Sequence, residues 1–303
     1  MRRAKGRRVG MRVELACDVK AEVGESPVWD IQRGGLWWVD LLRGELHFWE
    51  SRAGDVVRAR VGQSLGFVVP SLRSDSFVVG LADGIGVLTT DGQYTLMKAV
   101  EADRRNFRMN DGKCDRQGRL WAGTMNDATH RDGCLYRVDA DWQVTKVAES
   151  LGVPNGIGWT RNGTRMYFAD TGRARLEMWD FDPSNGERTE MSNVIEFDES
   201  DGGPDGLTVD AEDCVWVCLW GGHQVRRYAP SGEWLETIEV PALNVASCVF
   251  GGDDLRDLYV TTARYGMSTT DLQRWPLSGA LFRCRPGVQG VPADPFSGRL
   301  ALP

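Results

Sequence analysis

The chain has 303 residues, with 36 Lys or Arg against 43 Asp or Glu, which gives a formal net charge of −7. A hydrophobic fraction of 42% and a charged fraction of 26% are typical of a soluble globular protein and exclude a disordered chain. No apolar stretch approaches the roughly 20 residues that a spanning helix needs, and an acidic body repels phosphate backbones. We therefore expect neither a membrane nor a nucleic-acid partner.

The first ten residues carry five basic side chains, and strand-like sequence begins at Met11. The stretch that follows, residues 11–24, is polar and lacks the apolar segment of a signal peptide. We predict a disordered basic extension over residues 1–10 and a single domain over residues 11–303. The seven cysteines show no paired spacing and are interpreted as buried thiols of a reduced cytoplasm. We expect a cytoplasmic protein that is a monomer or a weak homodimer.

One short apolar and aromatic strand occurs six times along the chain. Its copies are Leu36–Asp40, Phe77–Leu81, Leu120–Thr124, Met166–Asp170, Val215–Leu219 and Leu258–Thr262. Their spacing of roughly 40–50 residues, with turn-forming residues between the strands, is typical of a four-stranded propeller blade. The sequence therefore predicts an all-β, six-bladed β-propeller. The first strand, Val13–Val19, has no unit of its own and should complete the last blade, which closes the ring.

A short polar motif precedes each aromatic strand, at the start of the unit. Since the innermost strand of each blade lines the central channel, Glu25, Asn110, Asn155 and Asp205 should meet near the axis. Carboxylates and amide oxygens that meet without a neutralising lysine are costly to desolvate, and a divalent cation removes that cost. Oxygen ligands favour Ca²⁺, Mg²⁺ or Mn²⁺. The alternative is that Pro-Asn-Gly and Pro-Asp-Gly are only turns, but their common register across repeats favours a site.

Five motifs carry a resemblance to a known family. They are Gly24-Glu25-Ser26-Pro27-Val28-Trp29, Arg108-Met109-Asn110-Asp111-Gly112-Lys113, Trp121-Ala122-Gly123-Thr124-Met125, Pro154-Asn155-Gly156-Ile157 and Gly203-Pro204-Asp205-Gly206. The chain resembles the SMP-30/gluconolactonase/regucalcin family over nearly its whole length. That resemblance implies a six-bladed propeller that hydrolyses a sugar lactone with one divalent metal ion, for which Ca²⁺, Mg²⁺, Mn²⁺ and Zn²⁺ are the candidates.

The resemblance also assigns roles to individual residues. It implies that Glu25, Asn155 and Asp205 bind the metal, that Asp205 is also the catalytic general base, and that Arg108 and Asn110 bind substrate. Beyond blade packing, Lys113 is given no role.

The chain departs from the family pattern after the Gly-Thr-Met motif. Where sugar-binding members have an acidic substrate contact, this chain has Ala128, and Asp127, one residue earlier, is the candidate replacement. Aromatic residues near strand ends, among them Trp29, Trp220 and Tyr265, are candidate walls of the pocket.

Two other functions remain open on the sequence. A non-catalytic propeller would use the same residues to hold a structural Ca²⁺ ion, and a related propeller esterase would act on phosphotriesters or lipophilic lactones. The pattern Gly62-Gln63-Ser64-Leu65-Gly66 matches a serine-hydrolase nucleophile elbow. The β-branched residues and the proline after it exclude the helix which that elbow requires.

Overall fold

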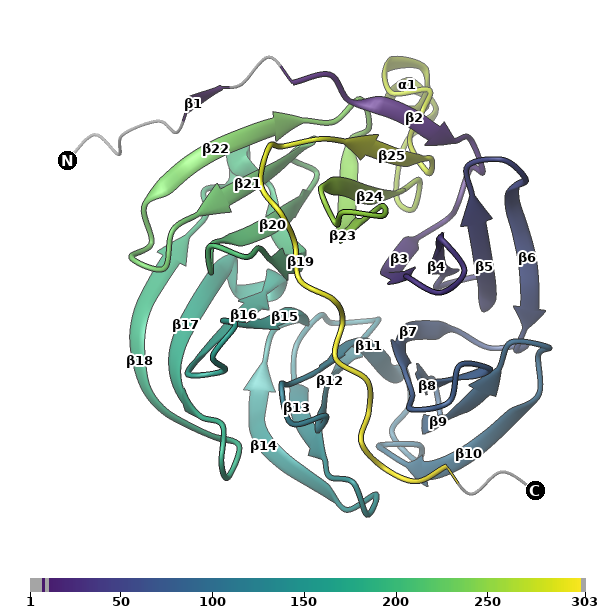
Figure 1. The fold of residues 1–303 in the computed structure, drawn as a ribbon, viewed down its shortest axis with the longest axis vertical. Coiled ribbons are helices and arrows are strands. Elements are labelled where there is room, and N and C mark those ends of the chain that lie inside the picture. The colour runs from purple at the N-terminus through teal and green to yellow at the C-terminus, as the bar shows by residue number, and fades with distance from the viewer. Residues whose placement is uncertain (1–6, 9–10, 301–303) are drawn as a thin grey trace.

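The computed structural model describes residues 7–8 and 11–300, and its six antiparallel blades are arranged in a ring around a central channel (Figure 1). Blades 1 and 2 consist of β3 (Gly24–Asp30), β4 (Gly35–Asp40), β5 (Glu45–Glu50), β6 (Gly54–Arg60), β7 (Leu65–Pro70), β8 (Ser76–Leu81), β9 (Gly84–Thr89) and β10 (Tyr94–Ala99). Blades 3 and 4 consist of β11 (Phe107–Cys114), β12 (Leu120–Asn126), β13 (Gly133–Val138), β14 (Val144–Leu151), β15 (Pro154–Trp159), β16 (Arg165–Asp170), β17 (Arg175–Asp182) and β18 (Glu187–Glu196). Blades 5 and 6 consist of β19 (Gly203–Val209), β20 (Val215–Trp220), β21 (Gln224–Tyr228), β22 (Trp234–Glu239), β23 (Asn244–Gly251), β24 (Asp257–Ala263), β25 (Leu281–Cys284) and β2 (Glu14–Cys17).

The ring closes as the sequence predicts. Strand β2 pairs antiparallel with β25, with Glu14 opposite Arg283, so the start of the domain completes the last blade. This pairing joins the two ends of the domain and removes a free sheet edge. A further short strand, β1 (Arg7–Arg8), pairs parallel with β22. The rest of the expected N-terminal extension, residues 1–6 and 9–10, lies outside the described residues.

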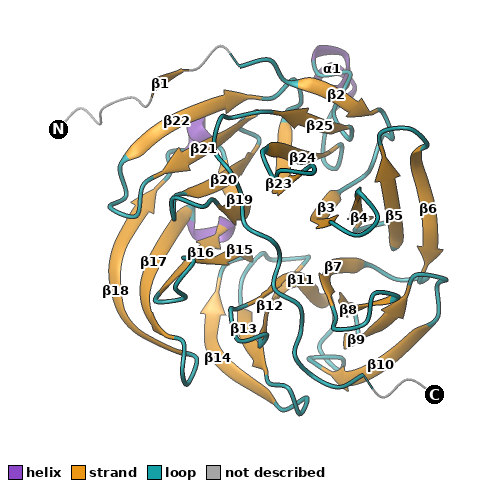
Figure 2. Cartoon of the chain, in the orientation of Figure 1, coloured by secondary structure: helices purple, strands orange, loops and turns teal. Residues whose placement is uncertain are grey.

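Strands account for nearly all regular structure in the described chain (Figure 2). The exceptions are α1 (Thr269–Arg274) and two 3₁₀ turns, η1 (Thr171–Arg173) and η2 (Glu199–Asp201). No helix in the described ranges, 7–8 and 11–300, has the length and apolar character needed to cross a bilayer.

Aromatic side chains fill the wedges between blades, which explains the abundance of tryptophan. Trp121 of blade 3 packs against Trp159 and Phe181 of blade 4, with ring centroids 6.0 and 5.6 Å away. Trp216 of blade 5 meets Phe250 of blade 6 edge-on, at 6.0 Å. The seven cysteines are free thiols, and six of them are buried in these layers, as the sequence predicts.

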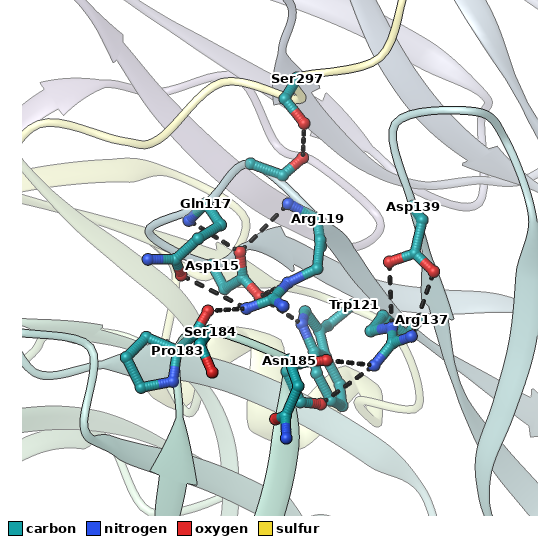
Figure 3. Close-up of polar contacts among 12 residues, drawn as sticks. Asp115, Gln117, Arg119, Trp121, Arg137, Asp139, Pro183, Ser184, Asn185 and Ser297 are labelled. Atoms are coloured by element: carbon teal, nitrogen blue, oxygen red, sulfur yellow. Dashed lines mark hydrogen bonds and ion pairs between the residues drawn. The ribbon is translucent and has the colours of Figure 1, made fainter.

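An aspartate at the end of the inner strand braces three of the blades; it is fully buried in blades 3 and 5 and partly buried in blade 1. Its carboxylate accepts a hydrogen bond from the indole Nε1 of a tryptophan on the neighbouring second strand, in the pairs Asp30–Trp37, Asp115–Trp121 and Asp210–Trp216. In blade 3, Arg119 adds a charge-assisted bond to Asp115 (Nε to Oδ2, 2.6 Å) and donates to the Pro183 carbonyl of blade 4 (2.8 Å; Figure 3). Such braces fix neighbouring blades relative to each other.

The last described segment, residues 285–300, crosses one face of the ring and is called the C-terminal strap below (Figure 1). Asp294 pairs with Arg116 (Oδ2 to Nη1, 2.6 Å), and the Phe296 backbone N–H donates to the Pro70 carbonyl (2.8 Å). A cavity of about 70 Å³ lies between the inner strands and strap residues 291–294. The strap therefore covers one end of the channel.

Candidate functional site

Each inner strand has an irregularity at its polar motif. The register shifts between Glu25 and Val28 in β3, and between Pro154 and Ile157 in β15. Strand β19 shifts likewise between Pro204 and Leu207, and β7, β11 and β23 shift at equivalent places. A bulge breaks the strict alternation of side chains and redirects them. The motifs are therefore parts of irregular strands, and the interpretation of Pro-Asn-Gly and Pro-Asp-Gly as turns is wrong.

Three buried carboxylates act on one another in the channel, those of Glu25, Asp111 and Asp205. Burial, followed by the charge of Asp111, raises the pKa of Glu25 to about 8. Burial and the charges of Glu25 and Asp111 raise the pKa of Asp205 far above its usual range. Glu25 and Asp205 thus lie together as predicted, and Asp111 is an acidic member that the sequence analysis did not single out.

Asn155 completes an oxygen-rich set beside these carboxylates. Its Nδ2 donates to the Thr171 hydroxyl (3.1 Å), which in turn donates to the Pro204 carbonyl (2.6 Å). The Asn155 side chain also donates a hydrogen bond to the Asp205 carboxylate, which lowers the pKa of that carboxyl against the larger effect of burial, and the amide oxygen is left to bind a cation. In the part of the chain that the structure describes, no three His, Cys, Asp or Glu side chains are grouped to hold a metal. Two carboxylates and one amide oxygen nonetheless fit a hard cation that keeps other positions open.

The expectation that no lysine lies near the carboxylates is wrong. Lys113 extends from β11 across to β19, where its Nζ donates to the Leu207 carbonyl (2.6 Å). Its charge acts on Glu25 and lowers the pKa of that carboxyl, against the larger effect of burial. Burial lowers the pKa of Lys113 itself, and the nearby Asp111 opposes this shift. The channel therefore holds a cationic side chain as well as three acids.

The residues expected to bind substrate form one network. Arg108 donates through Nη1 to Asn110 Oδ1 (2.8 Å) and through Nε to Asp127 Oδ1 (2.9 Å). The Asn110 amide nitrogen donates to the Pro154 carbonyl of the next blade (2.9 Å). Arg108 is buried, whereas the Asp127 side chain is 49% exposed. The carboxylate of Asp127 is thus held at the rim by Arg108, while Ala128 beside it is exposed.

The aromatic candidates separate into two groups. Tyr265 follows β24 of blade 6 and is 54% exposed, and its backbone carbonyl accepts a hydrogen bond from the Asn244 amide (3.1 Å). Trp29, in contrast, stacks on Tyr259 at 5.2 Å and borders a hollow next to strap residues Pro292 and Pro295. The expectation that Trp29 walls the site is wrong, because it lies at the far end of β3 from Glu25.

The fold and the site define a six-bladed propeller with a buried acidic cluster in its channel and an arginine–amide–carboxylate network beside it. The chain belongs to the family described as SMP-30/gluconolactonase/LRE-like, whose sequence pattern matches residues 23–264. It is 34% identical to a 6-deoxy-6-sulfogluconolactonase of Pseudomonas putida, over 95% of this chain and 100% of that protein. It is 32% identical to the regucalcin of Danio rerio, over 95% and 99% of the two chains.

Solved structures agree with this assignment. The crystal structure of a calcium-binding protein, regucalcin, from Agrobacterium tumefaciens superimposes with a TM-score of 0.88 at 28% sequence identity. The match covers 98% of this chain and 100% of that one. The resemblance seen in the sequence motifs is therefore confirmed at the level of the family and the fold.

Proposed function

We propose that the protein is a metal-dependent lactonase, which opens the ring of a sugar lactone to give the aldonic acid. The observation that carries this proposal is the meeting of the Glu25 and Asp205 carboxylates with the Asn155 amide, next to the Arg108 network. The name of the 34% identical relative, a sulfogluconolactonase, supports the same reaction class. The substrate is a neutral or anionic aldonolactone that fits beside an arginine.

Glu25, Asn155 and Asp205 would hold one divalent cation, Ca²⁺, Mg²⁺, Mn²⁺ or Zn²⁺. When bound, such an ion supplies Lewis-acid polarisation of the lactone carbonyl and stabilises the negative charge that develops on its oxygen. The remaining roles in the proposed reaction are carried out by side chains of the protein. Asn155 is kept in orientation by Thr171, so the amide needs little rearrangement when a ligand arrives.

Asp205 is the proposed general base. Its carboxylate accepts a proton from a water molecule as the water oxygen forms a bond to the lactone carbonyl carbon. The bond between that carbon and the ring oxygen then breaks, and the ring oxygen takes up the proton as a hydroxyl group. Each lactone that is opened consumes one water molecule and gives one molecule of the aldonic acid.

Arg108 is the proposed anchor for the substrate hydroxyls. Two of its nitrogens are engaged by Asp127 and Asn110, which fixes the plane of the guanidinium. Nη1 also donates to the Met109 carbonyl (3.1 Å), so the two N–H groups of Nη2 are the donors left for substrate hydroxyl oxygens. Asn110, whose amide bonds both Arg108 and the Pro154 carbonyl, holds this anchor against the next blade. Asp127 contributes a half-exposed acceptor at the rim.

The test is hydrolysis of a panel of γ- and δ-aldonolactones, corrected for background, by chelator-treated protein with and without each candidate metal. We expect turnover only with metal, and a loss of at least about 10³-fold in Asp205→Asn, a size typical for removal of a catalytic acid or base. Asp180→Asn, a half-exposed carboxylate of blade 4, is the matched control and should keep wild-type turnover.

Other outcomes of this experiment would favour one of the two alternative functions. Folded protein that binds Ca²⁺ but opens no lactone with any metal would contradict the proposal and favour the non-catalytic propeller. Turnover of an aryl phosphotriester in place of aldonolactones would favour the esterase. We also propose a cytoplasmic monomer or weak homodimer, to be tested by cell fractionation and by sedimentation across a range of protein concentrations.

A further inference from the structure

Lys113 is a partly buried cation that the proposed reaction does not use. Its side chain leaves β11 in blade 3 and ends at the Leu207 carbonyl of β19 in blade 5, with 2.6 Å between Nζ and the carbonyl oxygen. Leu207 lies two residues beyond Asp205 on the same strand. The ammonium group therefore lies further along β19 than Asp205, on the side of the channel that the C-terminal strap covers.

Asp111 shares the wall of this deeper region with Lys113. Both residues line the cavity that the C-terminal strap closes, together with Ser26, which directly follows Glu25. Asp111 Oδ1 accepts a hydrogen bond from the Gly112 backbone N–H (2.7 Å), which fixes its carboxylate within β11. Although the register of β11 shifts between Met109 and Gly112, Asp111 and Lys113 thus border the same cavity.

The charges in this part of the channel do not cancel. Glu25, Asp111 and Asp205 contribute three negative charges when ionised, and Lys113 contributes one positive charge. The charge of Arg108 also acts on Glu25, but Arg108 is paired with Asp127, so the two together add no net charge. The channel therefore presents two uncompensated negative charges, which is the charge that one divalent cation neutralises. Buried charge is stable only when it is compensated.

We propose that Lys113 and Asp111 are positioning residues that set the charge of the cation site, so that Lys113 makes the channel selective for divalent over trivalent ions. This inference rests on the proposed cation site of Glu25, Asn155 and Asp205, but it does not depend on lactone hydrolysis. A tether between blades 3 and 5 is the competing role for Lys113. A tether would affect stability, but it would not discriminate between cations of different charge.

The experiment compares Ca²⁺ with La³⁺, a trivalent ion of nearly the same radius, by calorimetric titration of the full-length metal-free protein. The measured quantity is the ratio of the two dissociation constants. Lys113→Met removes one positive charge and should shift this ratio toward La³⁺ on the order of tenfold or more, as expected for the loss of a nearby unit charge. Asp111→Asn should shift it in the opposite direction by a similar factor.

The double variant Asp111→Asn/Lys113→Met restores the net charge, so its ratio should return close to that of the wild type. Lys113→Arg keeps the charge and should leave the ratio unchanged. Circular dichroism and thermal unfolding report whether each variant folds, and if Lys113→Met does not fold, Asp111→Asn alone decides through the direction of its shift. A ratio that stays constant across the folded variants would overturn the proposal, as would a wild-type protein that binds neither ion.

These results separate the inference from the proposed lactonase. Metal-dependent lactone opening with an unchanged Ca²⁺ to La³⁺ ratio would refute the role of Lys113 alone. The predicted shifts in a protein that opens no lactone would support the charge balance and refute the proposed reaction alone.

Discussion

The C-terminal strap allows a quantitative prediction about how the ring is held together. Phe296 is the most deeply buried part of the strap: its side chain has no exposed surface and meets the ring of Trp142 edge-on at 4.9 Å. It joins the core cluster formed by the inner layers of blades 2 and 3. The Trp142 indole N–H in turn donates to the Arg299 carbonyl of the strap (2.9 Å). Phe296 therefore links the strap to two blades.

The variant Phe296→Ala would leave a cavity that the surrounding strands cannot fill. Complete burial of a phenylalanine places the expected loss in the free energy of unfolding at about 3–5 kcal/mol. For a chain of this size, that loss corresponds to a decrease in Tm of roughly 5–8 °C. The backbone hydrogen bond from Phe296 to the Pro70 carbonyl does not depend on the side chain, so it is not part of this loss.

Urea unfolding followed by tryptophan fluorescence measures the difference directly. The control is Leu72→Ala, in the neighbouring β7–β8 turn, where the side chain is 68% exposed and the expected change is within about 0.5 kcal/mol. A change of less than about 1 kcal/mol in Phe296→Ala would refute the view that the strap is part of the packed domain.

Three further predictions concern the rim, a blade brace and the effect of pH. Asp127→Asn should raise KM for the lactone by about three- to tenfold with little change in kcat, because it removes a charged acceptor that also orients Arg108; equal kinetics would contradict this. Asp115→Ala should lower the free energy of unfolding in urea by about 3 kcal/mol, because it leaves the partly buried Arg119 without its carboxylate partner and the buried Trp121 indole N–H without its acceptor; a change below 1 kcal/mol would contradict the brace. Burial raises the pKa of Asp30, but hydrogen bonds from Arg33 and Trp37 outweigh it and lower the pKa below the unfolded value of 3.8. Asp30 therefore stabilises the fold above about pH 4 and loses this effect as the pH falls through the lowered pKa, so the stability difference from Asp30→Asn should shrink between pH 7 and pH 2.

Much of the fold could be predicted because the residues that define each repeat are close together in the sequence. The six aromatic strands coincide with β4, β8, β12, β16, β20 and β24. Their strong β propensity and regular spacing do not depend on contacts made far away in the chain. The strap could not be predicted in the same way, since residues 285–300 carry no repeat and gain their order from Phe296, Asp294 and backbone pairing with distant blades.

The part of the site that could be predicted consists of residues whose position in the repeat alone places them at the channel. Glu25, Asn155 and Asp205 occupy the starts of inner strands, so the repeat register alone brings them together. Asp111 and Lys113 were missed because the register of β11 shifts between Met109 and Gly112. In a regular strand, Asn110 and Asp111 would face opposite sides, whereas here both are buried toward the channel region. Two-residue alternation starting from Asp111 is the signal that could have identified Lys113.

The glycines of the polar motifs explain why the motifs resemble turns although they lie in strands. A Cβ on Gly156 would lie 2.5 Å from the Asp205 carbonyl oxygen, and one on Gly206 would lie 2.3 Å from the Ser247 hydroxyl. Neighbouring inner strands contact one another around the whole ring, and only a residue without a side chain permits this approach. The glycine after Asn155 and the one after Asp205 therefore keep the channel narrow. A narrow channel brings the carboxylates of blades 1, 3 and 5 close enough for Glu25 and Asp111 to raise the pKa of Asp205, so the glycines that let the inner strands approach one another also shape the electrostatics of the site.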